Sequence, residues 1–119
     1  MKSRKELKEE FKQKKYRIGV FKISNNINGK IFIGSSMDLD AIWHAQKLQL
    51  DFDIHQNIEL QKDWKQFGAE NFHYEIVEEI IQKNDPKVNY QMEVKILEEM
   101  ILDDLKPFDK KGYNILKRK

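Results

Sequence analysis

Hydrophobic residues gather in two short runs near the start of the chain. Residues 17–24 and 30–35 are rich in Ile, Val and Phe, a composition that favours β-strands. The segment between them, 25–29, ends in Asn-Gly, a strong hairpin signal because both residues tolerate positive φ. The pattern therefore predicts an antiparallel hairpin that carries one phenylalanine on each strand, Phe21 and Phe32.

Apolar residues at helical spacing follow the hairpin. They predict a helix over residues 38–50, with Asp38 near its N-terminus. A second helix is expected between Asn57, a favourable N-cap residue, and Gly68, which suits the left-handed position after a helix. The two helices follow one another across a short polar connection.

The rest of the chain predicts one more strand and two more helices. Residues 71–80 alternate apolar and polar, which indicates a half-buried strand. A long helix is expected over 88–105, ending before Pro107 because a proline disfavours helix in the preceding residue. Residues 3–15 are rich in helix formers. The order α-β-β-α-α-β-α predicts an α/β domain of the α+β kind, a small three-stranded antiparallel sheet flanked by helices.

Charge is unevenly distributed along the chain. Residues 1–17 hold eight of the 22 Lys and Arg and three of the 20 Asp and Glu, a charge of +5, which leaves −3 for the remainder. We therefore expect a basic N-terminal helical arm, residues 1–16, ahead of one mildly acidic domain, residues 17–119. Such an arm is suited to nucleic-acid phosphates. The alternative is a solvated lysine-rich helix without a partner.

Composition narrows the class of protein further. At 39% hydrophobic and 35% charged residues, the 119-residue chain is expected to be globular with a heavily charged surface. It has no cysteine, which excludes disulfides and thiolate metal sites and makes the cytoplasm the expected location. No apolar run approaches the roughly 20 residues of a membrane span, and the first residues are charged where a signal peptide would be apolar. We expect no membrane partner.

One carboxylate falls among the apolar positions of the last predicted helix. On a helical projection Glu98 lies inside the apolar arc that runs from Leu97 through Ile101 and Leu105 to Leu102. A carboxylate on a core-facing side is costly to desolvate unless it meets a cation, a donor or a metal. Either Glu98 is a metal-binding or acid-base group, or it is a boundary residue that reaches water or pairs with a lysine.

The aromatic residues of the hairpin are weaker candidates. Phe21 shares a strand face with Gly19, and Phe32 shares one with Gly34. Glycine beside an aromatic ring leaves room for a ligand, but it also permits simple packing, which is the better interpretation. The histidines lack metal-ligand spacing and are expected on the surface: His44, His55 and His73.

These features together resemble the GIY-YIG endonuclease superfamily. The letters GVF at 19–21 stand where that family has GIY, and FIG at 32–34 stands where it has YIG, with an Asn-Gly hairpin between them. The resemblance continues through LQKDWKQFGAENFHYEIVEE at 60–79, ILEEMILDDLKP in the last helix and a final Tyr-Asn. It covers about residues 17–115.

The resemblance implies metal-assisted hydrolysis of a DNA phosphodiester. In the family, two tyrosines position and deprotonate the attacking water, an arginine stabilises the phosphorane charge, a glutamate holds one divalent ion, and an asparagine supports the site. Residue by residue, the family positions fall on Phe21, Phe32, Ile42, Glu98 and Asn114. Both tyrosine hydroxyls and the arginine are therefore missing, and only the glutamate and the asparagine are retained. A Mg²⁺ ion on Glu98 alone would bind weakly.

Two neighbouring cations are candidates to replace the lost arginine. Arg17 shares a strand face with Phe21, and Lys30 shares one with Phe32. Four residues after Ile42, where many family members have His, this chain has Gln46.

Three functions follow as hypotheses. The first is a catalytically impaired GIY-YIG-like domain that acts as a binding or regulatory module on nucleic acid. Its expected phosphate contacts are Lys5, Lys8, Lys12, Lys14, Lys15, Arg17 and Lys30. The second is an active, divergent endonuclease that depends on a divalent metal. The third is a protein-interaction module that docks through Leu7 and Phe11 of the arm.

Overall fold

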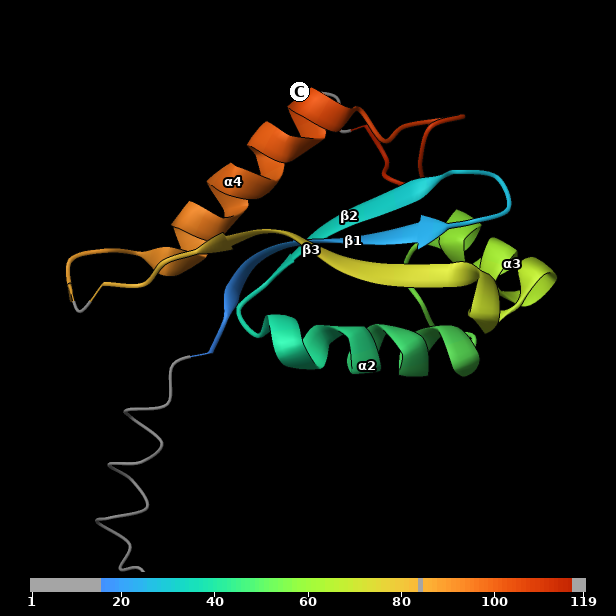
Figure 1. Cartoon of the computed structure of the whole chain (residues 1–119), viewed down its shortest axis with the longest axis horizontal. Coiled ribbons are helices and arrows are strands. Elements are labelled where there is room, and N and C mark those ends of the chain that lie inside the picture. Colours follow the sequence, from blue (N-terminus) through green and yellow to red (C-terminus); the bar gives the residue numbers. More distant parts are fainter. Residues whose placement is uncertain (1–15, 84, 117–119) are drawn as a thin grey trace, which may run out of the picture.

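The computed structural model describes residues 16–83 and 85–116 (Figure 1). The strands are β1 (Ile18–Asn25), β2 (Ile31–Ser36) and β3 (Phe72–Ile80), and the helices are α2 (Leu39–Asp51), α3 (Ile58–Phe67) and α4 (Tyr90–Leu105), with a short 3-10 helix, η1 (Ala69–Asn71), before β3. The predicted order and the predicted fold class are confirmed over these residues. The helix expected at 3–15 lies outside them. Within the described part of the chain, no helix combines the length and apolar character needed to cross a bilayer.

The sheet has β1 in its centre. Its strand order is β2-β1-β3, and β1 pairs antiparallel with both neighbours. In the β1–β2 hairpin Phe21 lies opposite Gly34, and Ile23 lies opposite Phe32. The hairpin therefore brings the two predicted motifs side by side.

The turn of this hairpin is where predicted, but its backbone differs from the prediction. Asn25 pairs with Lys30 across the turn through an N–H···O bond of 2.9 Å, so the loop holds residues 26–29. Gly29 has a φ of 75°, whereas Asn28 has no positive φ. The Asn28 side-chain oxygen instead accepts a hydrogen bond from the Lys30 N–H at 3.0 Å. A longer loop needs only one left-handed residue, which is why the Asn-Gly pair is used differently here.

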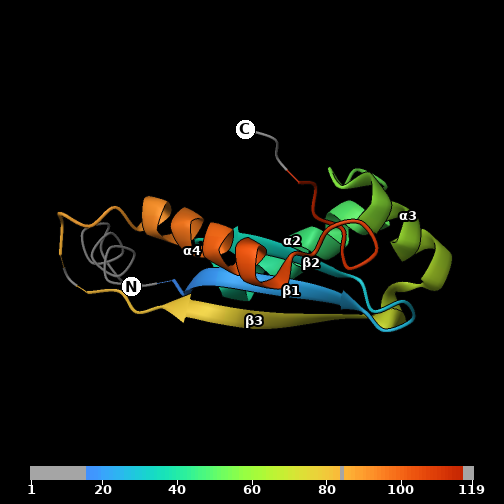
Figure 2. The same cartoon turned by 90° about the horizontal axis from the view of Figure 1, so that it is seen from above.

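Helices cover both faces of the sheet (Figures 1 and 2). On one face, α2 and α3 pack over a core cluster that includes Phe21 and Leu39. On the other face, α4 packs through Ile101 against Val20 and Ile33. Because successive residues of a strand point to opposite faces, Val20 and Phe21 belong to different halves of the core.

Polar side chains set the starts of the helices. Asp38 and Asn57 cap α2 and α3 through their side chains, as the sequence predicts. The α4 helix begins two residues later than predicted, because Asn89 accepts a hydrogen bond from the Met92 N–H at 3.2 Å and so becomes the N-cap. Gly68 ends α3 with the positive φ expected of a glycine at this position, 89°, but its ψ of 148° lies outside the left-handed helical range.

Candidate functional site

Phe21 lies at the centre of the sheet face that α2 covers. Its side chain is only 2% exposed. Its ring centroid is 6.4 Å from that of Phe32 and 5.7 Å from that of Tyr74. A Cβ atom added to Gly34 would come within 2.5 Å of the Phe21 Cζ. Gly34 therefore makes room for the Phe21 ring of the neighbouring strand, rather than for the Phe32 ring with which it shares a strand face.

The position that the resemblance assigns to the family arginine is also apolar in this fold. Ile42 and Phe32 are both half-buried and pack against the same core cluster as Phe21. One helical turn after Ile42, the Gln46 side-chain oxygen lies 2.5 Å from the His55 Nε2. The His55 ring meets the Phe32 ring edge-on, with centroids 5.8 Å apart. We call the group formed by Phe32, Ile42, Gln46 and His55 the α2 patch.

His55 is the member of this patch that the sequence did not indicate. His44 and His73 are exposed as predicted, but the surface prediction is wrong for His55, which is half-buried. Its Nδ1 accepts a hydrogen bond from the Asn57 N–H at 3.0 Å, so its proton resides on Nε2 and is donated to Gln46. Burial lowers the pKa of His55, which keeps the ring neutral. The half-buried position of His55 results from the contact of its loop with Gln46 of α2, and no residue spacing in the sequence predicts that contact.

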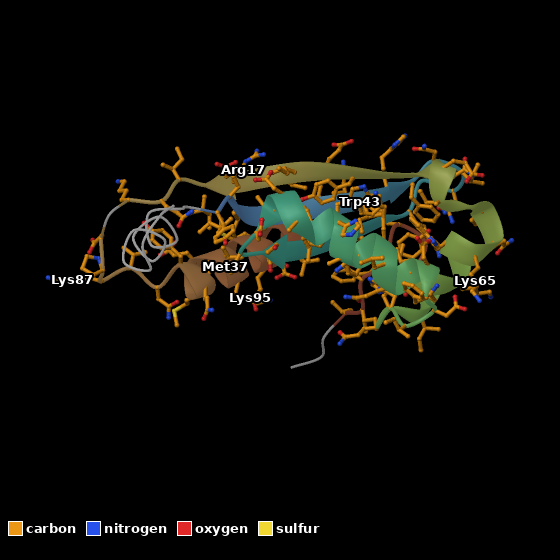
Figure 3. The ribbon with its side chains drawn as sticks, turned by 90° about the horizontal axis from the view of Figure 1, so that it is seen from below. Arg17, Met37, Trp43, Lys65, Lys87 and Lys95 are labelled. Carbon is orange, nitrogen blue, oxygen red and sulfur yellow. The ribbon has the colours of Figure 1, made fainter. Side chains whose placement is uncertain are left out.

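Glu98 stands on the other side of the sheet. Its side chain is 19% exposed, and its Oε2 accepts a hydrogen bond from the Ser35 Oγ at 2.5 Å. The Lys95 Nζ lies 3.4 Å from the same oxygen, on the exposed side of α4 (Figure 3). Ser35 follows Gly34 on β2 and so points away from the Phe21 ring. The geometry is that of the boundary glutamate that pairs with a lysine.

Asn114 closes the outer edge of β2. Its side-chain oxygen accepts from the Ile33 N–H at 2.8 Å, and its side-chain NH₂ donates to the Ile33 carbonyl oxygen at 2.8 Å. The preceding Tyr113 N–H donates to the Ile31 carbonyl oxygen at 2.8 Å. The Asn114 side chain thus supplies the two hydrogen bonds that a neighbouring strand would otherwise make to Ile33. Closure of this strand edge is enough to explain why Asn114 lies beside the FIG motif at 32–34.

The two candidate replacement cations are both engaged by carboxylates. Arg17 donates to Glu79 at 2.7 Å and to Asp40 at 3.0 Å, beside the first turn of α2 (Figure 3). The hydrogen bond to Glu79, followed by that to Asp40, raises the pKa of Arg17. Lys30 lies 3.8 Å from a Glu59 carboxylate oxygen. Neither forms a hydrogen bond with a side chain of the α2 patch. The lysines of the arm lie outside the described residues.

The structure therefore places the five positions that the resemblance assigns in three locations. Phe21, Phe32 and Ile42 belong to the core between α2 and the sheet. Glu98, on α4, binds Ser35 of β2 on the opposite face, and Asn114 binds the outer edge of β2. Among residues 16–83 and 85–116, no three His, Asp or Glu side chains come together in a way that could hold a metal ion. Glu98 offers one carboxylate, and the ammonium of Lys95 already lies beside it. The described residues do not make up a metal centre on their own.

Comparison with known proteins gives one sequence relative and two structural neighbours. No protein-family model matches the chain. Intron-associated endonuclease 1 of Enterobacteria phage T4 is 31% identical over 67 residues, which are 56% of this chain and 27% of the relative. This chain thus corresponds to about a quarter of the length of that protein.

Both structural neighbours are forms of one catalytic domain. The catalytic domain of homing endonuclease I-TevI superposes with a TM-score of 0.69 and 26% identity, over 84% of this chain and 99% of that one. A mutant of the same intron endonuclease domain superposes with a TM-score of 0.70 and 24% identity, over 87% of this chain and 97% of that one. The chain therefore has the fold of the I-TevI catalytic domain, the three-stranded α+β fold that its sequence predicts.

Proposed function

We propose that this chain is a GIY-YIG-like nuclease domain with impaired catalysis, acting as a module that binds nucleic acid. The observation that carries the proposal is the apolar packing of Phe21, Phe32 and Ile42, the three residues that the resemblance assigns to reactive positions of the superfamily. The similarity to an intron-associated endonuclease and to the I-TevI catalytic domain supports the superfamily and supports DNA as the partner.

The substitutions remove chemistry while they keep the packing. Phenylalanine retains the aromatic ring but has no hydroxyl to orient or deprotonate a water molecule. Ile42 replaces a permanent cation with a group that cannot stabilise negative charge. Loss of one preorganised donor lowers a rate by roughly 10²–10³. Three losses together reach about 10⁶, although such effects are not additive within one site.

Binding of nucleic acid needs fewer precisely placed groups than its cleavage does. Phosphate contacts require exposed cations rather than a preorganised site, and each contact adds about −0.9 to the slope of log K against log salt. We expect the arm lysines to supply most of these contacts, since Arg17 and Lys30 are already paired with carboxylates. Changing Lys5, Lys8 and Lys12 to Gln should weaken binding to duplex DNA and flatten the salt slope. The same change at three exposed lysines of the domain, Lys62, Lys87 and Lys110, is the matched control.

The test of the whole proposal is a nicking assay on supercoiled and branched DNA with Mg²⁺ and with Mn²⁺. We expect neither the wild type nor Glu98→Ala to cleave, while both remain folded and bind the same DNA. Cleavage by the wild type that disappears in Glu98→Ala would overturn the proposal. Absence of salt-dependent binding to both DNA and RNA would remove nucleic acid as the partner.

A second candidate, an active divergent nuclease, has one observation in its favour. The glutamate that the resemblance assigns to the metal is retained as Glu98, and the Lys95 Nζ places a cation 3.4 Å from its Oε2. If this pair supports cleavage, Lys95→Ala should abolish the activity together with Glu98→Ala. Lys106→Ala, at the end of the same helix, should leave that activity unchanged.

A further inference from the structure

An open groove of about 350 Å³ lies between the end of β3 and α4. Its apolar lining includes Ile81, Ile96 and Met100, which are 82%, 50% and 60% exposed. Ile96 and Met100 are four residues apart and so lie one above the other on α4. We call this surface the β3–α4 groove. It presents apolar side chains to solvent at a place where none of the candidate site residues lies.

The rim of this groove is acidic and partly uncompensated. Glu78, Glu79 and Glu93 all line it. Glu79 pairs with Arg17. Within residues 16–83 and 85–116, neither Glu78 nor Glu93 has an ion-pair partner. An apolar floor with unpaired carboxylates at its rim fits a segment that is both apolar and basic.

The chain itself contains such a segment, and it joins the domain beside this groove. Residues 1–16 hold seven Lys and Arg against three Glu, a charge of +4, and their apolar stripe is Leu7 and Phe11. These two residues are four apart, as Ile96 and Met100 are. The carbonyl oxygen of Tyr16 accepts a hydrogen bond from the Gln82 Nε2, which places the last arm residue next to the end of β3.

We propose that the arm binds in the β3–α4 groove of its own chain. Leu7 and Phe11 meet the apolar floor, and the arm lysines meet Glu78 and Glu93. The covalent link favours this partner, because tethering by a short linker raises the effective concentration of a segment to the millimolar range. While the arm is bound in this way, its lysines are neutralised by carboxylates, so the groove and nucleic acid compete for the same cations. This competition rests on the proposed function, whereas binding in the groove does not.

The experiment uses the absence of cysteine from the chain. A nitroxide on Ser3→Cys is then a unique label, and it lies 13 residues from Tyr16, up to roughly 45 Å of extended chain. A free tether of this length also brings the label near the groove part of the time, so the comparison of two charge-reversal variants, rather than broadening alone, reports binding. We expect the signals of Ile81, Ile96 and Met100 to broaden in the full-length ¹⁵N-labelled chain. Glu93→Lys should abolish this broadening.

The matched control is Glu99→Lys, the same charge reversal at an exposed residue of α4 that does not line the groove. It should leave the broadening unchanged. Broadening that is absent, spread evenly over the domain, or equal in the two variants would overturn the proposal. A mixture of ¹⁵N-labelled chain without a spin label and spin-labelled chain without ¹⁵N tests for contact between copies. Broadening of the groove signals in this mixture would also overturn the proposal, because the arm of a second copy would then occupy the groove. No nucleic acid is present, so the result is independent of the proposed function.

Discussion

The contact between Gly34 and Phe21 predicts a stability effect that can be worked out from the structure. An alanine Cβ at position 34 would lie 2.5, 2.9 and 3.1 Å from the Cζ, Cε1 and Cε2 atoms of the Phe21 ring. The ring is buried and contacts Tyr74, so it cannot move aside without disturbing the core. Overpacking of this kind costs about 1–3 kcal/mol. We expect Gly34→Ala to lower the free energy of unfolding by about 2 kcal/mol, or Tm by roughly 10 °C.

A double-mutant cycle in urea separates this clash from other effects. Leucine lacks the atoms beyond Cδ, so Phe21→Leu should relieve most of the clash. Phe21→Leu combined with Gly34→Ala should then be more stable than the sum of the single effects by at least about 1 kcal/mol. Gly29→Ala is the control, because Gly29 has a φ of 75° and nothing within 4 Å of its added Cβ. It should lose about 1 kcal/mol through backbone strain and show no coupling to Phe21→Leu. A stable Gly34→Ala variant, or a coupling within error of zero, would refute the reasoning.

Three further predictions concern buried or half-buried polar groups. Burial raises the pKa of Tyr113 from 10.0 to about 12, so the unfolded chain loses this proton first, and the free energy of unfolding should fall as pH rises from 10 to 12. Tyr113→Phe should remove that part of the fall in an alkaline series of urea melts, and an unchanged slope would contradict the assignment. Burial lowers the pKa of His55 from 6.5, so the unfolded chain binds this proton first and the free energy of unfolding should fall as pH drops below 6.5. His55→Gln should reduce this fall in an acid series of urea melts. An equal fall in both proteins would count against the role of His55. Asn114→Ala removes two hydrogen bonds of 2.8 Å to Ile33 and should cost about 1–3 kcal/mol and speed hydrogen exchange at the Ile33 amide, whereas an unchanged exchange rate would show that the edge is held by other contacts.

The spacing of hydrophobic residues predicted the helices and strands of this fold well, because an element that buries one face must carry apolar residues at the period of that face. The alternation around Phe72 and Tyr74 and the caps at Asp38 and Asn57 are local features, and the structure reproduces them. The errors also have local causes. Asn89 supplies a cap that displaces the start of α4. The division between arm and domain stays a prediction, since residues 1–15 lie outside the described part of the chain.

The contacts of the candidate site could not be predicted in the same way. Periodicity placed Glu98 on the inner side of its helix, but it could not name Ser35, 63 residues earlier, as the donor. The resemblance placed Asn114 at the site, yet its hydrogen bonds to Ile33 span 81 residues. A pattern within one element shows which face a residue occupies. The partner on the opposing element depends on how the elements are assembled.

The closure of β2 by Asn114 has a consequence for how this chain folds as it is synthesised. Until residues 112–114 have left the ribosome, the outer edge of β2 has open backbone groups, although every strand of the sheet already exists. Long-range pairings of this kind form late and leave intermediates prone to edge-to-edge aggregation. A nascent chain arrested before residue 112 should therefore associate through β2, and release of only a few more residues should end that association.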